Sequence, residues 1–253
     1  MVSGRAYLVT GAAGGIGAAT ASLLVERGAS VVVADLDGEG ASRVAGELGD
    51  RAVAAVCDVT DPDQVSAAVE AGLSAFGRLD GAVCNAGSVT LDAAWDATPE
   101  DWGRQLAVNV TGTFVTARAV GQHLRRHGGG AIVNVASNAG KVGYPNMAAY
   151  NASKAAVINL TRSLAREWAP EGINVNAVCP GGVDTPMLAG VAEWLGPRLG
   201  VEPSDLLEDM GPAQLGRKVR PGEVAAVIAF LLSDDARIIR GQSINVDGGD
   251  TPY

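Results

Sequence analysis

A tyrosine and a lysine one helical turn apart are the residues of this sequence best suited to acid–base chemistry. Tyr150 and Lys154 stand at positions i and i+4 near the start of a predicted helix, so their side chains share one face. A phenol has a pKa of about 10, too high for a base at neutral pH. A cation about 4 Å away, at an effective dielectric of about 20, would favour the phenolate by up to about three pKa units. The pair could serve as a general acid and base, although a lysine beside a core tyrosine is the commoner reason for such a spacing.

Two polar residues in other parts of the chain add to this chemistry. Ser137 comes just after the predicted strand 131–135, where a hydroxyl can donate to a carbonyl or alkoxide oxygen. Asn109 lies in the apolar stretch 106–110 of a long predicted helix. Because a buried asparagine must be hydrogen-bonded, Asn109 is either a structural tie or the holder of a water in a proton relay.

A glycine-rich turn joins the first predicted strand to the first predicted helix. Gly11, Gly15 and Gly17 allow a sharp turn, the approach of a pyrophosphate without an intervening Cβ, and close packing of the helix on the sheet. The N–H groups at the start of the helix would face the anion. The position of the glycines between a strand and a helix favours nucleotide binding over a merely tight turn.

An acid at the end of the second predicted strand indicates which nucleotide. Asp35 lies 18 residues after Gly17, where a carboxylate can accept hydrogen bonds from the adenosine ribose and repel a 2′-phosphate. Neither the glycine turn nor Leu36 supplies a basic partner for that phosphate. NAD is therefore expected rather than NADP, with a solvated carboxylate at a strand end as the alternative.

Polar residues also follow the third and fourth predicted strands. Asp58 comes after the third strand, and Asn85-Ala86-Gly87 comes after the fourth. Ligands of parallel α/β sheets lie beyond the carboxyl ends of the strands, at the point where the strand order reverses. Each of these motifs either contacts such a ligand or simply caps its own loop.

The elements that must hold these residues alternate along the whole chain. Short apolar runs typical of strands buried on both faces lie at 6–10, 30–34, 52–56, 81–83, 131–135, 173–178 and 243–246. Helical patterns lie at 15–27, 38–48, 61–76, 99–126, 148–169 and 221–232. This alternation predicts one α/β domain over residues 1–253, a doubly wound parallel sheet of about seven strands with helices on both faces. Residues 184–220, rich in proline and glycine, are expected to form an insertion that covers the site.

Composition excludes several other classes of protein. The formal net charge of the 253 residues is −9, which gives no general attraction to nucleic acid or to anionic lipid. No apolar run approaches the length of about 20 residues that spans a bilayer, and the N-terminus has no signal-peptide pattern, so a cytoplasmic protein is expected. The three cysteines are separate and lie in or beside apolar runs, as expected of buried thiols. His123 and His127 share a helix face but have no acidic or thiol third ligand nearby, so no metal site is expected.

Taken together, the motifs resemble the short-chain dehydrogenase/reductase family over essentially the whole chain. The resemblance implies a Rossmann fold with Asn109, Ser137, Tyr150 and Lys154 as a catalytic tetrad, and a homotetramer built through the helices at 99–126 and 148–169. It further implies that NAD is bound by Gly11, Gly15, Ile16, Gly17, Asp35, Asp58, Val59, Asn85, Ala86, Gly87, Tyr150, Lys154, Pro180, Gly181, Val183 and Thr185. One departure is Cys84, where the family usually has an asparagine; it touches no tetrad position.

The family chemistry implied by the resemblance is hydride transfer between a secondary alcohol and the nicotinamide. Tyr150 would take the hydroxyl proton, Ser137 would hold the oxygen, Lys154 would lower the pKa of the phenol and bind the nicotinamide ribose, and Asn109 would hold a water. The segment 140–145 and the ending 245–249 look similar to polyol and diol dehydrogenases. Leu188, Trp194, Leu199 and Met210 could form an apolar lid over the substrate, and Lys141 and Tyr144 could contact a polar one.

Other functions remain open on the sequence. The same site could reduce a ketone or a 3-oxoacyl group in the opposite direction. A protein that binds the dinucleotide as a sensor without turnover is a second alternative, against which the complete tetrad argues. An epimerase or dehydratase that returns the hydride within one cycle is a third, but such relatives usually carry a larger C-terminal substrate domain.

Overall fold

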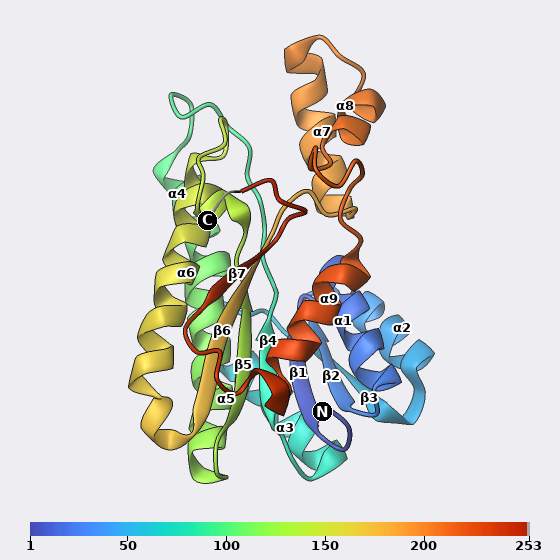
Figure 1. Cartoon of the computed structure of the whole chain (residues 1–253), viewed down its shortest axis with the longest axis vertical. Coiled ribbons are helices and arrows are strands. Elements are labelled where there is room, and N and C mark those ends of the chain that lie inside the picture. Colours follow the sequence, from blue (N-terminus) through green and yellow to red (C-terminus); the bar gives the residue numbers. More distant parts are fainter. Residues whose placement is uncertain (252–253) are drawn as a thin grey trace.

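The apolar runs of the sequence form a single parallel sheet in the computed structural model, which describes residues 1–251. The strands are β1 (Ala6–Thr10), β2 (Ser30–Asp35), β3 (Ala52–Val56), β4 (Gly81–Cys84), β5 (Gly130–Val135), β6 (Ile173–Pro180) and β7 (Ser243–Val246). Their order in space is β3-β2-β1-β4-β5-β6-β7, and every pairing is parallel (Figure 1). The order reverses between β1 and β4, so the predicted doubly wound fold is confirmed, and its switch point lies at the ends of these two strands. The last two residues of the predicted domain lie outside the described part of the chain.

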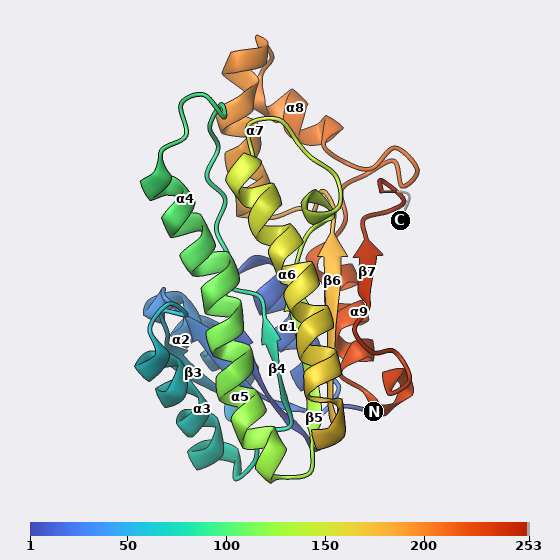
Figure 2. The same cartoon turned by 90° about the vertical axis from the view of Figure 1, so that its left-hand side faces the viewer.

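Helices cover both faces of the sheet (Figure 2). They are α1 (Gly15–Glu26), α2 (Gly38–Leu48), α3 (Pro62–Phe76), α4 (Pro99–Leu106), α5 (Thr113–Arg126), α6 (Ala148–Glu167), α7 (Pro186–Leu199), α8 (Pro203–Asp209) and α9 (Pro221–Leu231). Apolar side chains of α1, α2 and α9 pack on one face, and those of α3, α5 and α6 pack on the other. Because β1 is covered from both sides, all five of its residues are buried.

The long helix predicted at 99–126 is interrupted, and this corrects the sequence-based boundary. Residues 107–112 form a π-helical turn between α4 and α5. A π-turn inserts an extra residue into the helix and is frequent at functional sites. Here it contains Asn109, whose side chain is fully buried. Apolar periodicity predicts only that the segment is helical, since it does not distinguish a regular helix from one with a local bulge.

The segment 184–220 stands apart from the layers, beyond the carboxyl ends of the strands (Figure 1). It contains α7 and α8, which the sequence pattern does not predict because prolines and glycines interrupt it. Its two ends are joined by a parallel bridge between Val183 and Val219, in which the Val219 amide donates to the Gly182 carbonyl at 2.9 Å. The insertion therefore rises from one narrow base beside the switch point.

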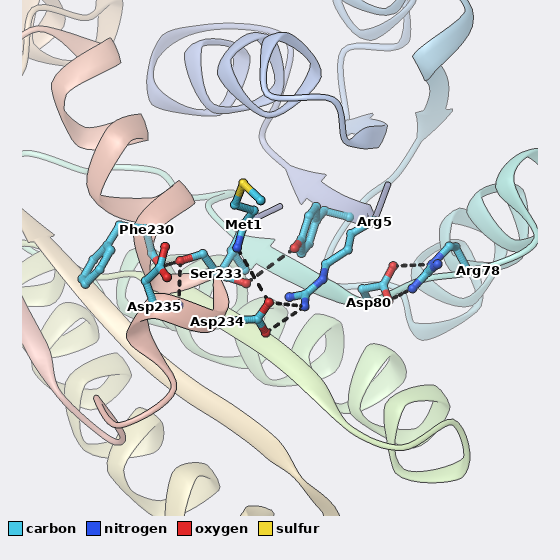
Figure 3. A network of polar contacts seen from close by, with 10 residues as sticks. Met1, Arg5, Arg78, Asp80, Phe230, Ser233, Asp234 and Asp235 are labelled. Carbon is cyan, nitrogen blue, oxygen red and sulfur yellow. Dashed lines mark hydrogen bonds and ion pairs between the residues drawn. The ribbon is translucent and has the colours of Figure 1, made fainter. Parts of the chain in front are cut away.

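At the end of the sheet opposite the switch point, ion pairs hold the start of β1 (Figure 3). The Arg5 guanidinium donates to both carboxylate oxygens of Asp234, at 2.8 and 2.7 Å, and the Met1 amine lies 3.7 Å from the same carboxylate. Asp80 accepts from the Ala6 amide at 2.8 Å and from Arg78. These contacts tie the central strand to the segments that follow α9 and precede β4, at the end of the sheet remote from the switch point.

Two further expectations concern the interior and the membrane. Cys57, Cys84 and Cys179 are buried and unpaired, as the sequence predicts. Within residues 1–251, no helix combines the length and the apolar character needed to cross a bilayer.

Candidate active site

A cleft of about 500 Å³ opens at the switch point, between the carboxyl ends of β1 and β4. Its walls include ten of the residues predicted to bind cofactor: Gly11, Gly15, Ile16, Asp35, Asp58, Val59, Asn85, Ala86, Gly87 and Thr185. Its other lining residues are Gly14, Leu36, Cys57, Ser88, Val108, Pro186 and Met187. Residues from four different strand ends thus meet where the topology of the sheet places a ligand.

The glycine turn forms the floor of this cleft with bare backbone. Gly11 has a φ of +64°, and a Cβ there would lie 2.8 Å from the Cα of Ala86, so a larger residue would push the β4 loop away. A Cβ on Gly17 would meet the carbonyl of Gly11. Asn85 donates through Nδ2 to the carbonyls of Thr10 and Gly11, at 3.0 and 2.9 Å, and so joins the two strand ends. The start of α1 has no side-chain cap, which leaves its amides to an anionic ligand such as a pyrophosphate.

Asp35 is held rigidly at the rim of the cleft. Its two carboxylate oxygens accept from the Ala13 amide at 2.8 Å and from the Asp37 amide at 3.0 Å. Arg43, the basic side chain bound to this turn, donates to the Ala13 carbonyl at 3.1 Å and to Glu47 at 3.3 Å. The rim therefore presents a fixed carboxylate, and the adjacent guanidinium is already engaged by other acceptors.

Asp58 caps its own loop, which is one of the two interpretations that the sequence left open. Its Oδ1 accepts from the amide and the hydroxyl of Thr60, at 2.9 and 2.7 Å, so the carboxylate caps its own loop. It also lines the cleft. The two roles are compatible because a carboxylate can accept several hydrogen bonds at once.

Asn109 links the loop after β4 to helix α6. Its Oδ1 accepts from the Ser88 amide at 2.9 Å, and its Nδ2 donates to the Ser88 carbonyl at 3.0 Å and to the Ser153 hydroxyl at 2.9 Å. All of these atoms are buried or partly buried. The structural tie foreseen for Asn109 is thus present in the structure.

Tyr150, Ser137 and Lys154 meet beside this loop. Ser137 begins a short turn after β5, where its Oγ accepts from the Ala139 amide at 3.1 Å. Burial raises the pKa of the Tyr150 phenol, and a hydrogen bond with Ser137 lowers it in part. The Lys154 ammonium lies 5.7 Å from the centre of the Tyr150 ring. The lysine thus lies over the ring. In this geometry the hydrogen bond with Ser137 is what counters the effect of burial on the pKa of Tyr150. The spacing in the sequence had predicted this effect for Lys154.

The Lys154 ammonium is itself buried, with 5% of the residue exposed. Its Nζ donates to the Val135 carbonyl at 2.9 Å, and burial lowers the pKa of the amine to about 8. A Cβ on Gly87 would lie 3.2 Å from Asn109 Oδ1 and 3.4 Å from Lys154 Nζ. Because Gly87 has no side chain, the loop can lie close to both the amide and the ammonium.

Comparisons with known proteins identify the family of this chain. A family model described as enoyl-(acyl carrier protein) reductase matches residues 11–251. A cis-4-hydroxycyclohexanecarboxylate dehydrogenase of Sinomonas cyclohexanicum is 45% identical over 98% of this chain and 96% of its own, and a D-threitol dehydrogenase of Mycolicibacterium smegmatis is 42% identical over 99% and 94%. The crystal structure of a 3-ketoacyl-(acyl-carrier-protein) reductase from Brucella melitensis with NADH has a TM-score of 0.88 and 38% identity, covering 99% of this chain and 100% of the other.

The chain belongs to the short-chain dehydrogenase/reductase family. It is accordingly an oxidoreductase that interconverts an alcohol and a carbonyl compound with a nicotinamide dinucleotide. The glycine floor, the exposed helix start and the carboxylate rim of the cleft fit such a dinucleotide.

Several predicted residues of this dehydrogenase/reductase, among them the whole tetrad, are not among the residues that line this cleft. Pro180 ends β6, and a Cβ on Gly181 would meet the Cβ of Asp247 at 2.7 Å. Val183 is buried in the bridge to Val219. From that loop only Thr185 reaches the cleft.

Other residues that line the cleft were not predicted from the sequence, including Ser88, Val108 and Met187. Ser88 directly follows a motif already placed at a strand end, so its position was an available signal. Met187 stands at the base of the insertion, where no pattern separates a lining side chain from a packed one. Leu199, which was expected in the lid, is 59% exposed at the end of α7.

Proposed function

We propose that this protein is an NAD-dependent dehydrogenase of secondary alcohols, such as polyols, diols or similar hydroxy compounds, with Tyr150 as its general acid and base. The observation that supports this proposal is that Asn109, Ser137, Tyr150 and Lys154, from three separate elements, lie close together beside Gly87, which lines the cleft. A sensor that only bound the dinucleotide would not need this arrangement.

In the proposed reaction, Tyr150 takes the proton of the substrate hydroxyl and Ser137 holds the same oxygen. When bound, the nicotinamide ring supplies the acceptor for the hydride that leaves the carbinol carbon. Burial raises the pKa of the phenol, so a positive charge is needed close to it for the phenolate to form near neutral pH. In the proposed reaction Lys154, whose ammonium lies 5.7 Å from the centre of the Tyr150 ring, supplies that charge in addition to the hydrogen bond from Ser137, and it binds the nicotinamide ribose through the same ammonium.

Asn109 and Gly87 give the proton a route away from the site. The Asn109 oxygen and the Lys154 nitrogen both lie close to Gly87. A water bound between them would have an acceptor on one side and a donor on the other, which is what a relay requires. The tie between Asn109 and Ser88 keeps the amide in place while protons pass.

Asp35 is the residue that supports a preference for NAD over NADP. Its fixed carboxylate can accept from the ribose hydroxyls of NAD, whereas the 2′-phosphate of NADP would meet a negative charge. Arg43 is held by Ala13 and Glu47 and is therefore poorly placed to offset that repulsion. We assign cofactor contacts to Gly11, Gly15, Ile16, Gly17, Asp35, Asp58, Val59, Asn85, Ala86, Gly87, Tyr150, Lys154, Pro180, Gly181, Val183 and Thr185.

The proposal also includes the location and the oligomeric state of the enzyme. A cytoplasmic homotetramer is proposed, with α4, α5 and α6 in the subunit contacts. Phe114 on α5 is 40% exposed, and Trp102, Leu106 and Val110 on the same stripe are only partly buried. This apolar surface would be covered in an oligomer. Light scattering that gave a monomer at working concentration would refute the tetramer.

The test of the catalytic proposal is Tyr150→Phe, assayed with NAD and a panel of secondary alcohols by absorbance of the reduced nicotinamide. Turnover should be abolished while NAD binding, followed by quenching of tryptophan fluorescence, stays close to that of the parent. Phe230→Tyr, which adds a phenol far from the cleft, is the matched control and should keep full activity. A Tyr150→Phe enzyme with the parental kcat would refute the assigned role.

The cofactor preference is tested separately by Asp35→Ser. The ratio of kcat/KM for NAD to kcat/KM for NADP should fall by at least about tenfold, because one charge repulsion and one ribose acceptor are removed together. Asp37→Ser, next to the same rim, is the control. Equal use of NAD and NADP by the parent would contradict this part of the proposal.

A further inference from the structure

The C-terminal turn at residues 247–251 lies against the loop that carries Ser137. Asp250 Oδ2 accepts from Asn138 Nδ2 at 2.9 Å and from the Tyr144 hydroxyl at 3.0 Å, and Asn138 Nδ2 also donates to the Tyr144 oxygen at 2.9 Å. Ser137 donates through Oγ to Asn138 Oδ1 at 3.4 Å. A carboxylate almost at the end of the chain is thus two hydrogen bonds away from the hydroxyl proposed to hold the substrate.

The turn that presents Asp250 is firmly anchored. Asp247, with 3% of its surface exposed, accepts from the amides of Gly249 and Thr251 at 3.1 and 3.0 Å. Gln214, at the base of the insertion, donates to the Gly249 carbonyl at 2.9 Å. Gly249 has a φ of +89°, a conformation that other residues rarely adopt. The position of the Asp250 carboxylate is therefore determined by the fold.

This carboxylate determines which end of the Asn138 amide faces Ser137. An ionised carboxylate can only accept hydrogen bonds, so the amide must direct its NH₂ group toward Asp250. The amide oxygen, Oδ1, is then directed toward Ser137. Without Asp250, the amide could turn over and present a donor at the same place.

Asn138 is 5% exposed, so its oxygen needs a partner whenever Ser137 turns away. Ser137 has one proton, and in the proposed reaction it must give that proton to the reacting oxygen of the substrate. A substrate with one hydroxyl leaves Asn138 Oδ1 competing for the same proton. A substrate with a second hydroxyl on the neighbouring carbon can donate to Oδ1 and release Ser137.

We infer that Asp250, acting through Asn138, is a positioning residue that makes this enzyme select substrates with a second hydroxyl next to the carbinol that is oxidised. The inference rests on the proposed function and deepens it from secondary alcohols to vicinal diols and polyols. Asn138 is the residue that contacts the second hydroxyl, and Asp250 keeps the Asn138 amide in the accepting orientation.

The experiment compares two substrates of one ring size, 1,2-cyclohexanediol and cyclohexanol, on the full-length enzyme with NAD. The parent should show a higher kcat/KM for the diol. Asp250→Ala should lower the ratio of the two values by about fivefold to tenfold, the effect expected of one hydrogen bond. Asp250→Asn, which keeps an acceptor oxygen, should retain part of the preference. Since each ratio is measured on one preparation, a partial loss of folded enzyme cancels.

Two further variants make the result decisive. Asn138→Ala removes the accepting oxygen itself and should abolish the diol preference even where Asp250→Ala is too unstable to assay. Glu208→Gln, which neutralises an exposed acid of α8, should leave the ratio as in the parent. A parent without diol preference, or an unchanged ratio in Asp250→Ala or in Asn138→Ala, would overturn the inference. Failure of the proposed function would look different, because neither substrate would then be oxidised.

Discussion

Replacing Lys154 should separate stability from activity, because this lysine is buried where its charge is costly. Burial lowers the pKa of its amine from 10.5 to about 8. Such a depression corresponds to about 3 kcal/mol, at about 1.4 kcal/mol per pKa unit. Below pH 8 the lysine is charged in both states, and the folded state bears the whole desolvation cost. Above pH 8 the folded protein releases this proton while the unfolded chain still holds it. The free energy of unfolding therefore increases with pH until the unfolded chain also loses the proton near pH 10.5.

Lys154→Met removes the ammonium and keeps the length of the side chain. The free energy of unfolding of the parent, minus that of Lys154→Met, should therefore rise by about 3 kcal/mol between pH 7 and pH 10.5. At pH 7 the variant is stabilised because no charge has to be buried. It is destabilised by about 1–3 kcal/mol because the hydrogen bond to the Val135 carbonyl is lost. We expect it to be at least as stable as the parent there, and to be inactive.

The assay is urea denaturation of the cofactor-free protein at pH 7.0, 8.0, 9.0 and 10.5, followed by circular dichroism. Groups that titrate in this range and are not coupled to Lys154, such as the Cys57 thiol, are common to both proteins and cancel in the difference. Lys218→Met, which removes a lysine from the base of the insertion, keeps Lys154 and is the control. The free energy of unfolding of Lys218→Met, minus that of Lys154→Met, should rise with pH as it does for the parent. A pH-independent difference between the parent and Lys154→Met would refute the reasoning about the buried charge.

Three further predictions follow from close contacts. Gly11→Ala should weaken dinucleotide binding at least about tenfold by titration, because its Cβ would lie 2.8 Å from Ala86 and because its φ is positive; unchanged affinity would contradict the assigned floor of the cleft. Asn109→Ala should lower the free energy of unfolding by about 1–3 kcal/mol in urea, since buried groups of Ser88 lose their partners; an unchanged midpoint would show that water replaces the amide. Asp234→Ala, in the exposed network of Figure 3, should leave kcat unchanged because it lies at the other end of the sheet, and a loss of turnover would contradict this separation.

The sequence alone was sufficient for the fold and for the floor of the cleft. Continuous apolar runs mark β1, β3 and β7, and each of the three begins and ends at the predicted residues, although of these three strands β1 alone is buried along its whole length. The places of Gly11 and Asp35 in the cleft were predictable because they depend on the local backbone and on the end of one strand. The proposed acid–base pair, Tyr150 and Lys154, was indicated by a spacing of one helical turn.

The tertiary structure decided how these groups act on each other. The pKa of Tyr150 depends on burial and on Ser137, which lies 13 residues earlier on a different element, and helical spacing does not show either influence. The π-turn around Asn109 and the two helices of the insertion arise from packing that overrides local pattern. The contact of Asp250 with Asn138 joins residues 112 positions apart, because the chain returns beside β6 only in its last strand. Contacts of this kind follow from three-dimensional closure, which has no periodic signature in the sequence.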